Sequence, residues 1–215
     1  WAFRRWQSSA RRNSETLGRL EAVNKEGEAV ALNDCIASSV SNPVNRRNEL
    51  MVRMRGYEEI SQGLGLVGLF FTLTTPSRFH AQRSGGGRNP AFNGASPREA
   101  MGWINVTWAR IRAAWKRAGV RVFGFRVSEP HHDGTPHNHF LLFVHSDDQA
   151  RACRLFGEQA MADSPGEPGA KKYRWDVKEI DPARGSATGY LSKYISKNID
   201  GYAVGWDTEA EDAAG

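Results

Sequence analysis

The chain has 215 residues, of which 40% are hydrophobic and 25% are charged. These values are typical of one globular domain of ordinary core size, with room for an appended segment. No apolar run approaches the ~20 residues of a membrane-spanning helix and no signal peptide is visible, so the sequence predicts no contact with a membrane. The two cysteines, Cys35 and Cys153, lack metal-ligand spacing, which favours a reduced, cytoplasmic compartment.

Basic residues outnumber acidic ones, and the formal net charge is +5. This balance favours a polyanionic partner, although many basic domains bind none. The placement of the charges is more informative, because they recur in three clusters: Arg4, Arg5, Arg11 and Arg12; Arg46, Arg47, Arg53 and Arg55; Lys171, Lys172, Lys193 and Lys197. Since the chain begins at Trp1 and ends in a loose acidic tail, residues 201–215, we expect it to be a piece of a longer protein.

Residues 1–62 are predicted to form a helical N-terminal segment. Residues 14–31 contain few helix breakers, and residues 45–60 place Leu50, Met54 and Tyr57 at helical spacing. The turn Ser41-Asn-Pro43 separates the two helices. We expect this segment to pack against the core, and DNA contact through its arginines is a secondary possibility.

The remaining elements alternate between strands and helices in the order β-α-β-β-α-β-α. Ser96-Pro-Arg-Glu99 has the residues of a helix start, with a capping serine and a glutamate at the third helical position. This order predicts an α+β fold, an antiparallel sheet of about four to five strands with flanking helices mainly on one face. The predicted strands are residues 69–75, 120–127, 140–144 and 173–180, and the predicted helices are residues 96–119, 147–162 and 187–199.

Pro130 to Pro136 reads as the loop of a hairpin, and it is followed by His137 and His139. On a strand these two imidazoles leave the same face, and Glu129 at the end of the preceding strand would lie roughly opposite His137. Two imidazoles and a carboxylate form a site for a borderline-to-hard divalent metal ion. The alternative is a strand end with two solvated histidines.

The last predicted helix presents Tyr190, Lys193, Tyr194 and Lys197 within an arc of roughly 100°. A phenol has a pKa near ~10 and is a poor nucleophile when neutral, but adjacent lysines favour the phenolate. The alternative is a surface helix with partly buried tyrosines and solvated lysines. Together with the predicted metal site, the helix indicates metal-assisted attack of tyrosine on a DNA phosphodiester.

Three motifs in this order resemble those of the HUH endonucleases that initiate rolling-circle replication. They are Phe71-Thr-Leu-Thr-Thr-Pro-Ser77, His137-Asn-His139, and the two-tyrosine motif Tyr190-Leu-Ser-Lys-Tyr194. More narrowly, residues 42–56, 72–80 and 129–139 resemble the phage replication gene A protein family. The resemblance covers roughly residues 40–200. Residues 63–200 would then be an HUH endonuclease domain with an RRM-like or palm-like sheet.

The resemblance implies an enzyme that nicks and rejoins single-stranded DNA at a replication origin in the cytoplasm of a bacterial host. A hairpin is one form that the origin could take. It implies Mg²⁺ or Mn²⁺ bound by His137, His139 and Glu129, with Tyr190 and Tyr194 as alternating nucleophiles beside Lys193 and Lys197. A host helicase is an expected partner. His131, His132 and Glu179 are alternative third ligands.

Asn138 departs from the family pattern, in which the residue between the histidines is bulky and hydrophobic. Because this position faces away from the metal, we expect altered packing and retained ligation. Three other functions are compatible with parts of the sequence: a relaxase or transposase with the same tyrosine chemistry, a noncatalytic single-strand-binding module, and a metal-dependent hydrolase that uses water.

Overall fold

A four-stranded antiparallel sheet forms the centre of the computed structural model, which describes residues 12–13, 15–83, 85–183 and 185–199. The strands are β3 (Leu66–Leu73), β4 (Val122–Pro130), β5 (Pro136–His145) and β6 (Trp175–Glu179), in the spatial order β4-β5-β3-β6. Residues 1–11 and the predicted acidic tail, 201–215, lie outside the described residues. The α+β class and the antiparallel sheet are therefore confirmed.

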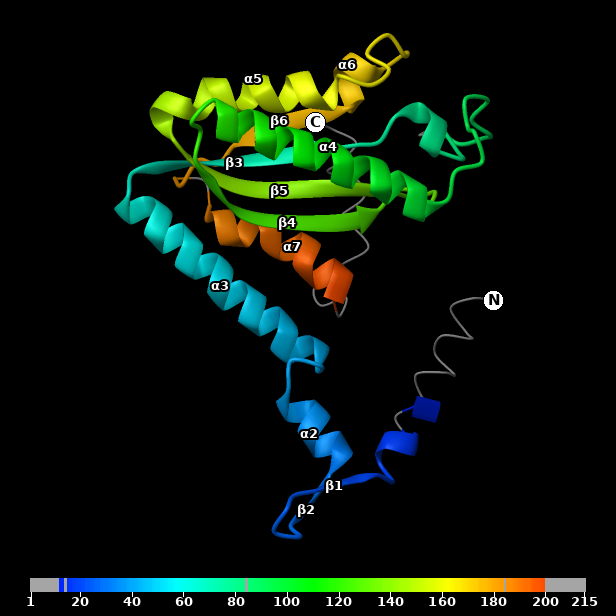
Figure 1. The fold of residues 1–215 in the computed structure, drawn as a ribbon, viewed down its shortest axis with the longest axis vertical. Helices are drawn as coiled ribbons and strands as arrows, with labels where there is room; N and C mark the ends of the chain where they lie inside the picture. The colour runs from blue at the N-terminus through cyan, green and yellow to red at the C-terminus, as the bar shows by residue number, and fades with distance from the viewer. Residues whose placement is uncertain (1–11, 14, 84, 184, 200–215) are drawn as a thin grey trace.

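Helices cover both faces of the sheet (Figure 1). Helices α4 (Pro97–Arg117) and α5 (Gln149–Ala160) lie on one face, whereas α3 (Pro43–Gly63) and α7 (Ala187–Ile199) lie on the other. The prediction of helices mainly on one face is wrong. Both faces need a cover because every residue of β5 from Asn138 to Val144 is buried, so neither face of that strand meets water.

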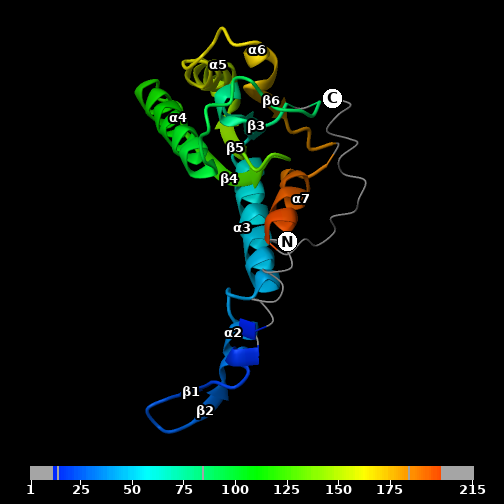
Figure 2. The same ribbon diagram turned by 90° about the vertical axis from the view of Figure 1, so that its right-hand side faces the viewer.

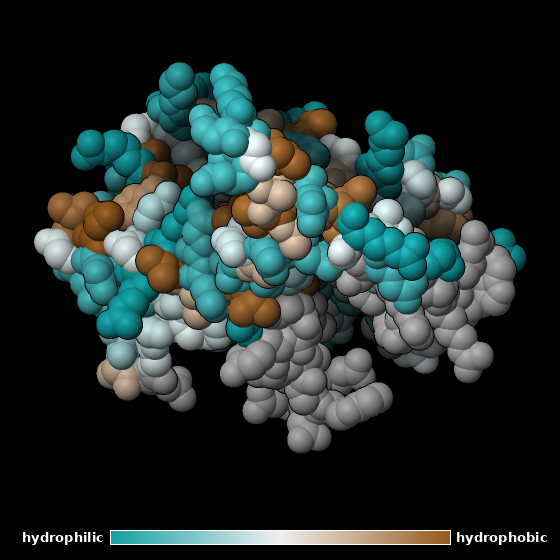
Figure 3. Space-filling view, turned by 90° about the horizontal axis from the view of Figure 1, so that it is seen from below, coloured by the Kyte–Doolittle hydropathy of each residue, from teal (hydrophilic) through white to brown (hydrophobic). Residues whose placement is uncertain are grey.

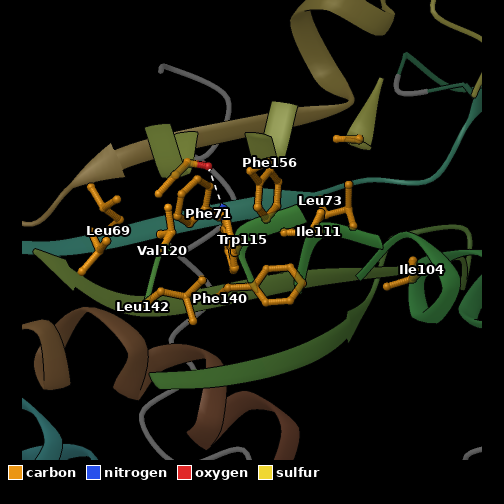
Figure 4. Close-up of a cluster of buried hydrophobic side chains, with 13 residues drawn as sticks. Leu69, Phe71, Leu73, Ile104, Ile111, Trp115, Val120, Phe140, Leu142 and Phe156 are labelled. Atoms are coloured by element: carbon orange, nitrogen blue, oxygen red, sulfur yellow. Dashed lines mark hydrogen bonds between the residues drawn. The ribbon is translucent and has the colours of Figure 1, made fainter. Parts of the chain in front are cut away.

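The face toward α4 and α5 holds the larger aromatic core (Figure 4). The ring of Phe71 on β3 stacks on Phe156 of α5 at 4.4 Å, and Trp115 of α4 donates its indole N–H to the carbonyl of Ala152 at 3.1 Å. This buried indole thus has a partner, as an indole in a core requires. The predicted start of α4 is confirmed, because Ser96 and Glu99 form a reciprocal capping box.

The opposite face holds a smaller cluster that joins the sheet to α3 and α7. Met54 of α3, Phe70 of β3 and Leu191 of α7 are buried in it. The predicted helix 45–60 is therefore confirmed as α3, and it packs on the sheet through Met54. The boundary predicted at residues 62 and 63 stays a prediction.

The prediction of a helix over residues 14–31 is confirmed for residues 15–17 and is wrong beyond them. The chain instead forms a hairpin of β1 (Glu21–Val23) and β2 (Ala29–Ala31), followed by α2 (Leu32–Ser38). Asn24 accepts hydrogen bonds from the backbone N–H groups of Glu26 and Glu28, and Gly27 adopts a φ of 85°. Such local side-chain bonds compete with the helix. The hairpin and α2 lie beyond the start of α3, away from the sheet (Figure 2).

Short elements complete the described chain: the 3₁₀ turns η1 (Ser77–Phe79) and η2 (Ser146–Asp148), and the one-turn helix α6 (Ala170–Tyr173). Seen from below, hydrophobic residues are scattered among hydrophilic ones (Figure 3). Within the described residues, no helix is both long and apolar enough to cross a bilayer.

Asp163 anchors η1 to the end of α5. Its carboxylate accepts two hydrogen bonds from the Arg78 guanidinium, at 2.6 and 3.1 Å, and one from the Trp103 indole at 2.7 Å. These donors, Arg78 first, hold the pKa of Asp163 well below its usual range.

We predict that this anchor loses its stabilising effect in acid. Because the folded-state pKa is depressed, the stabilisation is present above the unfolded-state pKa of ~3.9 and is lost as the pH falls below it. Asp163→Asn should therefore lower the melting temperature at pH 7. Between pH 5 and about 2.5 the melting temperature of the variant should fall less than that of wild type. Thermal unfolding followed by circular dichroism measures both. Equal acid sensitivity of the two proteins would contradict the prediction.

Candidate metal and tyrosine site

The hairpin of β4 and β5 brings Glu129, His137 and His139 together at one end of the sheet. Glu129 pairs directly with His137, as predicted. The Nε2 atoms of the two histidines lie 2.9 Å apart, and Glu129 Oε2 lies 3.7 Å from His137 Nε2 and 3.4 Å from His139 Nε2. In the described part of the chain these residues form a group whose donor atoms all lie within 4.8 Å of one another.

His139 is held in one orientation by β3. Thr72 pairs with His139 across the strands, and its hydroxyl hydrogen-bonds to His139 Nδ1 at 3.1 Å. The Phe70 ring stacks on the imidazole with centroids 5.3 Å apart. A hydrogen bond at Nδ1 leaves Nε2 as the nitrogen that faces His137 and Glu129, which is how partners of metal-binding histidines set the tautomer.

The donor set fits a divalent cation. Glu129 and His139 are each only 6% exposed, and a carboxylate buried this far needs a compensating charge. Two imidazole nitrogens at 2.9 Å also repel each other through their lone pairs unless a proton or a cation lies among them. Imidazole and carboxylate together suit borderline-to-hard metals such as Mn²⁺.

The three alternative ligands lie outside this group. Glu179 accepts a hydrogen bond from Gln149 at 2.7 Å and pairs with Leu69, away from the Thr72 end of β3. The ring of His131 packs edge-on against His137 at 4.8 Å, with its Nδ1 3.1 Å from that of His132. Burial, then the neighbouring histidines, lowers the pKa of His131 to about 4, so its imidazole is neutral at pH 7.

Asn138 faces the opposite side of the sheet from the two histidines, as expected. It is fully buried and hydrogen-bonds with Ser128 at 2.9 Å. When the amide of Asn138 is turned so that both its oxygen and its nitrogen have partners, the oxygen also accepts hydrogen bonds from the Arg126 guanidinium at 2.5 and 3.1 Å. Burial lowers the pKa of Arg126, which lies over the Phe140 ring. Asn138 therefore provides a hydrogen-bond acceptor for the half-buried Arg126 and does not displace the histidines.

Helix α7 lies over the histidine face of the sheet. The Tyr194 ring is 4.2 Å from the His139 ring and stacks on Phe70 at 5.4 Å, and Tyr190 meets Phe70 edge-on at 4.7 Å. Tyr194 is 8% exposed, whereas Tyr190 is more open and borders a hollow with Lys178. The side chains of Lys193 and Lys197 lie outside the described residues.

Residues 1–202 match the family described as "Bacteriophage replication gene A protein (GPA)". The chain belongs to this family. The family resemblance predicted from the three motifs is thus confirmed, and it extends further toward the N-terminus than residue 40.

Phage and prophage proteins are among the relatives of this chain. The "Replication gene A protein" of Escherichia phage 186 is 46% identical over 209 residues, covering 96% of this chain and 30% of that protein. The "Replication protein" of Haemophilus phage HP1 is 40% identical over 213 residues, covering 98% and 27%. A "Probable replication endonuclease from prophage-like region" of Salmonella paratyphi A is 38% identical, covering 94% and 25%. The chain spans less than a third of each relative's length. No solved structure matches it.

One residue of the site has no signal in the sequence. Glu58 of α3 accepts hydrogen bonds from the first two amides of α7, Ala187 at 2.8 Å and Thr188 at 3.2 Å, and from the Thr188 hydroxyl at 2.6 Å. Ser186 accepts from the third amide, that of Gly189, at 2.9 Å. The free N–H groups of the tyrosine helix are therefore capped largely by another helix. Glu58 lies 129 residues from Ala187, so local sequence patterns cannot reveal it.

We predict that Glu58 fixes α7 over the metal group. Glu58→Ala should cost about 1–2 kcal/mol of unfolding free energy, because it removes a cap and a negative charge from a helix N-terminus. It should also speed hydrogen exchange in residues 187–199. The matched control is Glu59→Ala, since Glu59 is exposed and forms its ion pair within its own helix, with Arg55 at 3.1 Å. Denaturant unfolding and exchange mass spectrometry measure both effects, and equal results for the two variants would refute the role of Glu58.

Proposed function

We propose that this chain is the catalytic part of a replication initiator that nicks and rejoins single-stranded DNA at an origin through a 5′-phosphotyrosine. One observation carries the proposal: a helix with two tyrosines packs directly on a group of two histidines and a glutamate, with Tyr194 4.2 Å from His139. The prophage relative from Salmonella paratyphi A, named "Probable replication endonuclease from prophage-like region", supports the same activity.

In this proposal Glu129, His137 and His139 hold Mg²⁺ or Mn²⁺. The bound ion supplies positive charge that polarises the phosphoryl group and stabilises charge developing in the transition state. Thr72 keeps His139 Nε2 directed at the group through its bond to Nδ1. Glu129 compensates the cation's charge in a buried setting.

A tyrosine oxygen attacks the scissile phosphorus, and the bond from phosphorus to the 3′ oxygen breaks. The phenol proton is lost and the departing oxygen gains one, which leaves a free 3′-OH and a phosphotyrosine on the 5′ side. In the reverse direction the 3′-OH attacks the phosphotyrosine and closes the strand. The bond energy is conserved in both steps, so the reaction needs no ATP. Lys193 and Lys197 are proposed to favour the phenolate.

Two tyrosines allow two successive strand transfers without release of the first DNA end. We propose that Tyr190 and Tyr194 alternate, one cutting the regenerated origin while the other holds the 5′ end. In this proposal basic side chains contact the backbone of the single strand and aromatic side chains stack on its bases. A host helicase supplies the unwound template, and a hairpin at the origin presents the single strand.

We predict that the double variant Tyr190→Phe/Tyr194→Phe forms no covalent product, while each single variant retains some. Tyr194→Phe should lose more, because Tyr194 lies against His139. The measurement is a denaturing gel of labelled single-stranded origin oligonucleotides with Mn²⁺ or with EDTA. A metal-dependent band shifted by the mass of the protein reports the adduct.

Tyr57→Phe is the control for loss of a hydroxyl, since Tyr57 lies on α3 against Phe123 and Phe125. Full cleavage by the double variant would remove the tyrosines as nucleophiles. Cleavage without an adduct would identify a hydrolase that uses water, and DNA binding without cleavage would identify a noncatalytic binding module.

We predict that His137→Ala and His139→Ala each lower metal-dependent cleavage by at least ~100-fold while leaving DNA binding within a few-fold, because a lost ligand typically abolishes transition-state stabilisation. The control is His145→Ala at the exposed, opposite end of the same strand. Isothermal titration with Mn²⁺ should show one site in wild type and in His145→Ala, and none in His137→Ala. Unchanged Mn²⁺ binding in the histidine variants would rule out the metal group.

A further inference from the structure

A pocket of about 620 Å³ opens at the same end of the sheet as the metal group. It is formed where three segments meet: the chain after β3, the loop between β4 and β5, and the loop that leads through α6 to β6. Its volume falls in the range of sites that take small ligands, ~300–1,000 Å³. Of the residues described for the metal and tyrosine site, His131 and His132 line it, whereas Glu129, His137, His139, Tyr190 and Tyr194 do not.

The walls of this pocket are fixed by hydrogen bonds between distant segments. Glu167 accepts from the backbone N–H of Ser77 at 3.1 Å and from the fully buried Arg174 at 2.5 Å. Asn89, which is 7% exposed, donates to the carbonyls of Ser77 and His80, both at 2.8 Å. The pocket is therefore preformed, as ligand sites usually are, and a ligand would meet little reorganisation cost.

A second set of contacts ties the pocket to the metal group. His80 bonds to Thr75 at 3.0 Å and to Asp133 at 3.2 Å, so the chain after β3 holds the loop between β4 and β5. His131 packs edge-on against His80 at 5.5 Å and against His137 at 4.8 Å. One imidazole thus separates the pocket from a proposed metal ligand. If a nucleic-acid strand has one phosphate at the metal group, its neighbouring nucleotide would lie in the pocket.

The lining combines the groups that a nucleotide needs: an aromatic ring, a cation and hydrogen-bonding side chains. Tyr173 is 64% exposed and offers a ring, with Lys172 Nζ 5.0 Å from its centroid. Arg83 adds a cation for a phosphate, and amide and imidazole groups such as those of Gln82 and His132 can bond the edge of a base. Aromatic stacking with neighbouring cations is how proteins hold the bases of single strands.

We propose that this pocket binds one nucleotide of the single-stranded DNA, the one adjoining the scissile phosphate, with its base against Tyr173. The identity of the strand rests on the proposed function, but nucleotide binding in the pocket does not. The pocket gives the nicking site a base to recognise, so it is a candidate determinant of where the origin is cut.

The direct test is titration of the ¹⁵N-labelled chain in EDTA with dAMP, dCMP, dGMP and dTMP, followed by NMR. At least one mononucleotide should shift the amides of His132, Gly169 and Tyr173. Tyr173→Ala should weaken that binding about 10-fold or more, whereas Tyr173→Phe, which keeps the ring, should stay within about two-fold of wild type. Because Tyr173 belongs to α6, a second variant outside that helix is needed: Arg83→Ala, with Arg110→Ala on the exposed side of α4 as its charge-matched control.

A second experiment tests the position of the nucleotide on the strand. Origin oligonucleotides with a single abasic residue are compared in the nicking assay, and the abasic residue beside the cut should raise KM about 10-fold in wild type. Tyr173→Ala should show the raised KM already and gain little more from the abasic residue. If Tyr173→Ala leaves nicking unchanged and no mononucleotide shifts the pocket amides, the proposed nucleotide site is wrong and the proposed nicking function stands. If the chain binds mononucleotides in the pocket but nicks no origin oligonucleotide, the proposed nicking function is wrong and the nucleotide site stands.

Discussion

The register between β3, β4 and β5 is the constraint on which the site depends. Side chains alternate between the faces of a strand, so pairing Glu129 with His137 and Thr72 with His139 puts two ligating imidazoles, a carboxylate and an orienting hydroxyl on one face. A slip of one residue would turn the histidines toward α4 and α5 and bring Asn138 to the tyrosine helix. The aromatic core on the other face, with Phe140 fully buried, makes such a slip costly and so protects the site.

A sheet alone supplies only half of the site, because the tyrosines come from a separate helix. Helix α7 is held at its start by Glu58 of α3 and along its length by its own Leu191, which is buried in the smaller core with Phe70 of β3. Polar capping fixes where the helix begins, and apolar packing fixes its rotation about its axis. Both are needed to keep Tyr194 against His139. The N-terminal α3 is thus a structural part of the site, although it contributes none of the proposed catalytic groups.

Much of the site could be predicted because it follows local periodicity. The two-residue spacing of His137 and His139 and the four-residue spacing of Tyr190 and Tyr194 each define a face. Glu58 could not be predicted, because its contact with Ala187 joins distant segments. The hairpin at Asn24 was missed because one side chain outweighs weak helix propensity over residues 14–31. The covering of both faces had a signal, the unbroken apolar run from Phe140 to Val144, which an alternating, one-sided strand would lack.

The polar residue between the two histidines follows from the same two-faced geometry. The histidine face requires only that the side chain of residue 138 point to the other face, and any residue at this position does so. The other face requires a buried side chain that fits its neighbours. Arg126 on β4 brings a guanidinium to that face, and a hydrophobic residue at position 138 would leave it without the acceptor that Asn138 provides. Arg126 and Asn138 therefore form a matched pair across the hairpin, on the face of the sheet opposite the ligands.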